Sequence, residues 1–210
     1  MIKLLKYFIW DFDGTLVDTY PSMSIAFQRA LKNEGINASE EEVLRLLKQS
    51  SKHALAYYNL DKSFKKKWKA IEERVDKAQS QPFQGVLEVL NLIVNNGGEN
   101  YIVTHRDETT YEYLKFHQML SYFTDVITIE KANQRKPHTD LFDQIIAKNK
   151  IIPSQCLSIG DRILDMIPSK ALGLKTCFYN PKGLDHEVAV DYEIKEYKRL
   201  EEILRKNFNR

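Results

Sequence analysis

Short runs of apolar, β-branched or aromatic residues recur along the chain and predict β-strands. They cover Tyr7–Trp10, Tyr101–Val103, Val126–Ile129, Leu157–Ile159 and Thr176–Tyr179. Amphipathic helical patterns alternate with the later runs. Short, almost wholly apolar strands between helices are typical of a parallel sheet that is covered on both faces. The pattern therefore predicts an α/β fold with a doubly wound, Rossmann-like parallel sheet.

The interval between the first two predicted strands shows only helical periodicity. Ser39, followed by three glutamates, has the character of a capped helix start. Further on, apolar residues recur at spacings of three and four and predict one buried helix face: Phe64, Trp68, Ile71 and Val75. This interval far exceeds one crossover connection. We therefore expect a small helical cap domain, residues 19–81, inserted into an α/β core domain made of residues 1–18 and 82–210.

Composition excludes several classes of protein. The chain has 210 residues, of which 43% are hydrophobic and 29% charged, which is an ordinary globular composition. A net charge of +2 gives no general electrostatic case for binding nucleic acid or a membrane. The one basic run, residues 65–69, is expected to be a solvated helix face with Trp68 turned inward. We expect a monomer or homodimer with no nucleic-acid or membrane partner.

The cysteines and the amino terminus indicate a compartment. Cys156 and Cys177 lie at predicted strands and form no C-x-x-C pair, so we expect buried free thiols in a reducing environment. The first apolar segment is interrupted by Lys3 and Lys6 and stopped by Asp11, which makes it too short for a signal peptide or a membrane span. A cytoplasmic protein is expected.

Polar residues follow several of the predicted strands, where ligands of open parallel sheets bind. The first strand runs into the segment Asp11-Phe12-Asp13-Gly14-Thr15, the second into Thr104-His105-Arg106, and a later one into Gly160-Asp161. Asp165 follows one helical turn later, and Lys136 stands shortly before a predicted helix over residues 140–148. A lone D-x-D-G string is ordinarily a turn. Several such segments at one sheet edge indicate a site.

The carboxylates of this edge require a cation. Placed close together they repel one another, so they must be protonated or neutralised. Hard oxygen ligands with room for water suit Mg²⁺. Lys136 and a helix start after Thr104 would add positive potential for a phosphate. The sequence predicts an anion site built around Mg²⁺.

Four segments carry a family resemblance. "DFDGTLVDT", "YIVTHRD", "KPHTDLF" and "GDRILD" resemble, in this order, the four motifs of the haloacid dehalogenase-like hydrolases. The resemblance covers essentially the whole chain, and the helical insertion resembles the small cap of the phosphoglycolate phosphatase and β-phosphoglucomutase-like branch. Four motifs in order, each at a predicted strand end or helix start, are far more specific than one.

The resemblance implies a Mg²⁺-dependent phosphatase that hydrolyses a small phosphorylated metabolite. Asp11 would be the nucleophile that forms an aspartyl-phosphate. Asp13 would protonate the leaving oxygen and then activate water. Thr104 would hold the transferring phosphoryl group, and Lys136 would screen its charge. The metal would be held by Asp11, by Asp13 through its backbone carbonyl, and by Asp161.

Other site residues are less sharply defined. Asp165 either binds the metal, directly or through water, or orients Lys136. Gly14 and His105 are expected at the phosphate through the backbone. Arg106 either contacts a substrate anion or forms a salt bridge on the exposed side of its helix. Lys48, in the cap stretch "LLKQSSKHAL", is a candidate for substrate specificity.

Alternative functions remain within the same resemblance. Asp13 disfavours a dehalogenase, because those enzymes lack this second acid. A β-phosphoglucomutase-like phosphomutase typically carries His where this chain has Met23. A non-catalytic phosphate-binding protein would be expected to lose the nucleophile, the acid or the metal ligand, and all are present. Phosphoglycolate, sugar phosphates, nucleotides and pyridoxal phosphate remain open as substrates.

Overall fold

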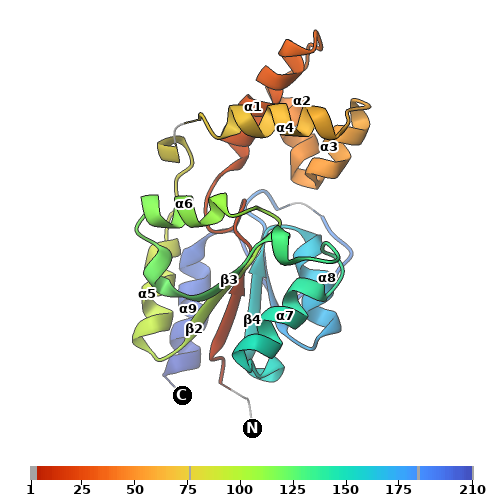
Figure 1. Ribbon diagram of the computed structural model, residues 1–210. Helices are drawn as coiled ribbons and strands as arrows, with labels where there is room; N and C mark the ends of the chain where they lie inside the picture. The colour runs from red at the N-terminus through yellow and green to blue at the C-terminus, as the bar shows by residue number, and fades with distance from the viewer. Residues whose placement is uncertain (1–3, 76, 184, 210) are drawn as a thin grey trace. The chain divides into compact units, whose positions relative to one another are not determined.

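The core of the molecule is one parallel β-sheet with helices on both faces (Figure 1). The computed structural model describes residues 4–75, 77–183 and 185–209. Six strands lie in the order β3-β2-β1-β4-β5-β6, and each neighbouring pair is parallel. The predicted doubly wound α/β fold is confirmed.

The strands lie close to their predicted positions. Their bounds are β1 Tyr7–Trp10, β2 Glu99–Val103, β3 Phe123–Ile127, β4 Cys156–Gly160, β5 Lys175–Tyr179 and β6 Tyr192–Ile194. The predicted end of the third strand at Ile129 is wrong, because the Ile129 amide donates to the Arg106 carbonyl and opens a short 3-10 turn. β6 was not predicted, since three residues with one exposed member give too little apolar pattern.

The two faces of β1 belong to two different apolar clusters. Phe8 and Trp10 pack in the cluster that contains residues of α5 (Val86–Asn95) and α9 (Tyr197–Phe208). Tyr7 and Ile9 point to the opposite face, where α7 (Asp140–Asn149) covers them. α8 (Ile163–Ala171) lies on the same side as α7, through a 2.7 Å hydrogen bond from Ser169 to Ser158 of β4. Figure 1 shows α5 and α9 on one side of the sheet and α7 and α8 on the other. Both faces of the sheet are thereby buried.

The chain divides into two compact units. One, here the core unit, is formed by the chain up to Val17 and from Pro82 onward; the other, here the cap unit, is Asp18–Gln81. The cap unit contains α1 Tyr20–Asn33, α2 Glu40–Gln49, α3 Ser51–Tyr57 and α4 Lys62–Glu72. The assignment of these units as two domains stays a prediction.

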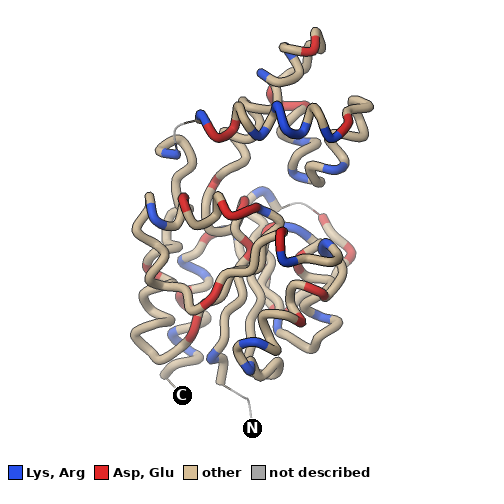
Figure 2. The backbone as a smooth tube through the Cα atoms, in the orientation of Figure 1, with Lys and Arg blue, Asp and Glu red and all other residues tan. Residues whose placement is uncertain are grey.

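The cap unit has an apolar core of its own. The ring of Phe27 lies 5.2 Å from that of Phe64 and 5.0 Å from that of Trp68, both in edge-on contact. Trp68 is buried as expected, and basic positions recur along α4 (Figure 2). Ser39 caps α2 as predicted, because its hydroxyl accepts a 3.1 Å hydrogen bond from the Glu42 amide.

The two cysteines lie within the sheet. Cys156 and Cys177 are free and buried in β4 and β5, and burial raises the pKa of both thiols far above the usual value. Their packing makes them structural residues.

Among the helices of the described residues, none combines the length and the apolar character needed to cross a bilayer.

Candidate active site

The candidate site is set by three neighbouring strands that end at the same edge of the sheet. β1 lies between β2 and β4, and the residues that follow these strands are Asp11, Thr104 and Asp161. The Asp11 amide still donates to the Ile159 carbonyl at 2.9 Å, which extends the ladder one residue past β1. The sheet register therefore fixes the backbone of Asp11 beside the end of β4.

The loop after β1 is held in a tight turn. Gly14 has φ of +79°, a conformation that glycine adopts without a steric penalty, and its amide donates to the Val17 carbonyl at 2.9 Å. From α9, the buried Tyr197 hydroxyl donates to the Thr15 carbonyl at 2.6 Å. The Thr15 hydroxyl in turn donates to Asp161 at 3.3 Å. These bonds fix the loop, which carries Asp11 and Asp13, against the core.

Lys136 reaches the same point from the loop before α7. Its ammonium donates three hydrogen bonds: to Asp11 Oδ1 at 2.8 Å, to Asp165 Oδ1 at 2.6 Å and to the Val103 carbonyl at 2.8 Å. The ammonium is fully buried. Burial by itself would lower the pKa of Lys136, but the charges of Asp11 and Asp165 outweigh it and raise the pKa above the usual value. Lys136 is a fixed cation.

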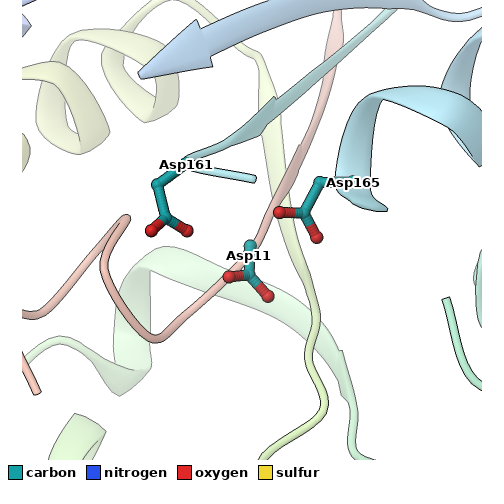
Figure 3. Close-up of side chains that lie close together, drawn as sticks. All are labelled: Asp11, Asp161 and Asp165. Carbon is teal, nitrogen blue, oxygen red and sulfur yellow. The ribbon is translucent and has the colours of Figure 1, made fainter. Parts of the chain in front are cut away.

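Three carboxylates lie together beside this cation. One oxygen of each of Asp11, Asp161 and Asp165 lies within 4.8 Å of the others, as the side chains in Figure 3 show. The second oxygen of Asp11, Oδ2, is buried and accepts no hydrogen bond from the described residues. Burial, with the charge of Asp165, raises the pKa of Asp11 to about 6, although Lys136 and Arg162 oppose the rise. A hard divalent cation fits this donor set and would use this oxygen, which accepts no hydrogen bond from the described residues.

Asp165 is fully buried at the start of α8, and its two oxygens have different partners. Oδ1 accepts from Lys136, and Oδ2 accepts a 3.3 Å hydrogen bond from the Arg162 amide. A Cβ atom on Gly160 would lie 2.6 Å from the Cβ of Asp165, so glycine is the residue that lets α8 approach β4 here. These contacts favour the orienting role that the sequence left open.

Arg106 forms a buried ion pair within the site. It is buried, it precedes α6 (Thr109–Phe116), and its Nε donates to Asp13 Oδ1 at 2.7 Å. The guanidinium also lies 5.1 Å from the centroid of the Tyr113 ring. The expected salt bridge on the exposed side of a helix is therefore wrong, because the partner is a site residue.

The segment after β2 differs from the expected helix start. α6 begins at Thr109, five residues beyond Thr104, with Glu108 at its N-cap position, so the predicted helix dipole directly after Thr104 is absent from this segment. The Thr104 hydroxyl accepts a 3.0 Å hydrogen bond from the Arg106 amide instead. His105 Nε2 accepts from the Lys136 amide at 2.8 Å. Burial, helped by nearby cations, lowers the pKa of His105 to about 2, so this imidazole stays neutral.

Arg162 was missed by the sequence analysis. Its guanidinium lies 3.7 Å from Asp11 Oδ2 and 4.0 Å from oxygens of Asp161 and Asp165. The signal was present in "GDRILD", where a basic residue stands between two acidic ones. Lys48 lies in the cap unit, in the last turn of α2, with its ammonium 5.3 Å from the centroid of the Tyr20 ring.

Comparison with known proteins identifies the class of the chain. The sequence profile of the haloacid dehalogenase-like hydrolases matches residues 8–179, from β1 to the end of β5. The chain belongs to this hydrolase family. The resemblance seen in the four motifs is confirmed.

Several characterised relatives are similar along most of their length. A glyceraldehyde 3-phosphate phosphatase from Pyrococcus furiosus is 22% identical, over 97% of this chain and 94% of the relative. A phosphoglycolate phosphatase from Vibrio parahaemolyticus is 24% identical, over 80% and 81%. The pyrophosphatase PpaX from Anoxybacillus flavithermus is 24% identical, over 85% and 86%. The names of the two phosphatases agree with the predicted enzyme class, a phosphoric monoester hydrolase.

A solved structure extends the similarity to the fold of the whole chain. A hydrolase from Streptococcus pneumoniae TIGR4 is 29% identical, with a TM-score of 0.63 over 97% of this chain and 100% of that one. The cap unit is thus covered by the similarity as well as the core unit.

Proposed function

We propose that the protein is a Mg²⁺-dependent phosphatase that hydrolyses a small phosphomonoester through an aspartyl-phosphate on Asp11. The observation that carries the proposal is the environment of this carboxylate. One oxygen accepts from Lys136, the other accepts no hydrogen bond among the described residues, and oxygens of Asp161 and Asp165 lie within 4.8 Å. An ionised carboxylate beside a fixed cation and a cation-binding donor set suits attack on a phosphoryl group.

The chain's own groups divide the reaction between them. Asp11 attacks phosphorus, and the bond from phosphorus to the leaving oxygen breaks as Asp13 donates a proton to that oxygen. Asp13 then accepts a proton from the water that cleaves the aspartyl-phosphate, which returns Asp11 as a carboxylate. Lys136 screens the charge between Asp11 and the phosphoryl group, and Thr104 with the backbone of His105 holds its oxygens. The expected contact of the Gly14 amide with the phosphate is not part of this proposal, because that amide donates to the Val17 carbonyl.

A divalent metal fits the acidic end of this site. Asp11, Asp161 and the backbone carbonyl of Asp13 would hold Mg²⁺, which supplies positive charge against the developing negative charge of the phosphoryl oxygens. Asp165 supports the site by holding Lys136 at 2.6 Å. The support for the metal is the buried Asp11 oxygen that accepts no hydrogen bond from the described residues and lies within a cluster of hard oxygen donors.

Hydrolysis is favoured over phosphoryl transfer to a second sugar position. Met23, which stands where β-phosphoglucomutase-like enzymes typically carry His, packs against the apolar core of the cap unit. Its side chain offers no proton acceptor. The Asp11, Asp13 and Lys136 set disfavours a non-catalytic phosphate-binding protein, since such a protein has no need of a nucleophile paired with an acid.

A phosphate-release screen tests the proposal. The purified protein is incubated with phosphoglycolate, glyceraldehyde 3-phosphate, pyrophosphate, sugar phosphates, nucleotides, pyridoxal phosphate and an aryl phosphate, with Mg²⁺ or with excess chelator. We expect turnover of at least one monoester that vanishes with chelator, returns with Mg²⁺ and falls by orders of magnitude in Asp11→Asn. Undiminished turnover in the chelated protein would contradict the metal, and normal turnover by Asp11→Asn would contradict the covalent step.

A further inference from the structure

Arg162 places a second cation at the acidic end of the site. It stands between Asp161 and the start of α8, and its side chain is 14% exposed. Its Nη2 lies 3.7 Å from Asp11 Oδ2, and its Nε lies 4.0 Å from both Asp161 Oδ1 and Asp165 Oδ2. One guanidinium thus lies within ion-pair distance of all three carboxylates that cluster at this edge.

We propose that Arg162 is a tethered counter-cation, which neutralises the three carboxylates in the metal-free protein and weakens their affinity for a divalent metal. The inference rests on the metal site of the proposed function and adds a residue that tunes it. The distances support an electrostatic role, because separations of 3.7–4.0 Å are ion pairs and exceed a hydrogen bond. Such contacts are readily given up when another cation arrives.

The charge balance gives the direction of the effect. The three carboxylates are matched by two cations, Lys136 and Arg162, so the metal-free cluster carries about one net negative charge. Lys136 cannot respond to a metal, because its ammonium already donates to three buried oxygens. Arg162 is the more exposed of the two, and its ion pairs with these carboxylates have separations of 3.7–4.0 Å. Its charge stabilises the metal-free cluster and repels a divalent cation at the same place.

Two other roles of Arg162 predict different results. If the guanidinium served only to hold a substrate phosphate, its loss would raise KM and leave Mg²⁺ affinity unchanged. If the residue served only to begin α8, replacing its side chain would have no effect on the site. The hydrogen bond from Arg162 to Asp165 at the helix start is donated by the backbone amide, which both Gln and Lys at this position keep. Mg²⁺ affinity measured without substrate separates these roles from a counter-cation.

The test is a calorimetric titration of the full chain with Mg²⁺ in the absence of substrate. Arg162→Gln removes the charge, Arg162→Lys keeps it, and Arg205→Gln on the exposed face of α9 is the control for a change of net charge. We expect Arg162→Gln to bind Mg²⁺ about tenfold more tightly than the wild type, with both other variants close to the wild type. In chelator, Arg162→Gln should unfold at a lower temperature than Arg162→Lys, and saturating Mg²⁺ should reduce that difference.

The outcomes of the titration separate the proposed role of Arg162 from the proposed metal site. Equal or weaker binding by Arg162→Gln, with normal binding by the wild type, would overturn the role of Arg162 and leave the proposed function intact. Tight binding by Arg162→Gln beside weak binding by the wild type would support it. Binding by none of the variants would overturn the metal site, and the counter-cation with it.

Discussion

Arg106 and Asp13 form a buried ion pair, with Nε of the guanidinium 2.7 Å from Oδ1 of the carboxylate. Only 5% of the Arg106 side chain and 15% of the Asp13 side chain are exposed. The pair joins the end of β2 to the loop after β1, and the ring of Tyr113 lies under the guanidinium. Arg106 therefore sets the orientation of the carboxyl group to which the proposed mechanism assigns proton transfer.

Loss of Arg106 should act on turnover. In Arg106→Gln the Asp13 carboxylate loses its ion pair with the guanidinium, and with it the orientation that this contact imposes. We expect kcat to fall by about 10–100-fold with a smaller change in KM, since one preorganised contact at a reacting group is removed. Stability should fall by about 1–3 kcal/mol, because the Asp13 carboxylate loses a charge-assisted hydrogen bond at a mostly buried position. Steady-state kinetics and denaturant unfolding measure the two effects.

The controls for this prediction separate charge from geometry. Arg106→Lys keeps the charge without the planar fork and should recover part of the stability but little of kcat. Arg199→Gln, which breaks an exposed pair with Glu202, should leave both quantities near the wild-type values. A wild-type kcat in Arg106→Gln would show that Arg106 does not position Asp13.

The raised pKa of Asp11 should give the metal-free protein a characteristic dependence on pH. Burial and Asp165 raise the pKa of Asp11 to about 6 from the ordinary value of 3.8. Between these values the folded state binds more protons than the unfolded state, so this group's contribution to stability falls as pH rises from about 4 to about 6. The full effect is on the order of 2–3 kcal/mol.

The measurement is a difference between two proteins in chelator. His105, whose pKa is lowered to about 2 by burial, contributes a slope of opposite sign, because its unfolded form takes up a proton below about pH 6.5. Subtracting the unfolding free energy of Asp11→Asn removes this background. We expect the wild type to lose stability relative to Asp11→Asn as pH rises to about 6. A difference that stays constant from pH 4 to 8 would contradict the raised pKa.

The absence of a side chain at Gly160 should matter for the site as well as for stability. In Gly160→Ala the new Cβ would meet Asp165 2.6 Å away, and α8 has to shift. We expect a loss of about 1–3 kcal/mol from overpacking. Turnover and Mg²⁺ affinity should fall too, since Asp165 holds Lys136.

Gly98→Ala is the matched control for Gly160→Ala. Its Cβ would lie 2.8 Å from Cγ2 of Ile93, a similar overlap at the position before β2 and therefore at the opposite sheet edge. This variant should be destabilised by a comparable amount, with normal turnover per folded molecule. Equal losses of turnover in both variants would attribute the Gly160 effect to general destabilisation.

The backbone positions of the site could be predicted from the sequence, but the distant contacts of its long side chains could not. Asp11, Thr104 and Asp161 could be placed from the sequence, because strands β1, β2 and β4 are short apolar runs whose ends meet at one sheet edge. The pairing of Arg106 with Asp13 and of Arg162 with Asp11 could not, since a long side chain reaches residues that lie far away along the chain. Arg106 pairs with a residue 93 positions earlier. The start of α6 was also missed, because Thr104–Glu108 continues as a turn held by local bonds such as the one from Thr109 to Asp107.

Substrate choice should depend on a residue of the cap unit, while turnover of every substrate depends on the core unit. Lys48 lies at the end of α2 with its ammonium near the Tyr20 ring, and we propose it as a specificity contact. Lys48→Ala should then change the ranking of substrates in the phosphate-release screen while turnover of a small aryl phosphate stays largely intact. Lys136→Ala should reduce turnover of every substrate, because Lys136 serves Asp11 and the phosphoryl group itself.

Lys66→Ala is the matched control for the Lys48 change. Lys66 is an exposed lysine of α4 in the same unit, so its replacement makes the same change in net charge and side-chain length. The substrate ranking of this variant should equal that of the wild type. Equal losses on all substrates in Lys48→Ala, in a protein that unfolds at the wild-type temperature, would count against a specificity contact. A ranking altered alike by Lys48→Ala and Lys66→Ala would point to the net charge of the cap unit, which both changes lower by one.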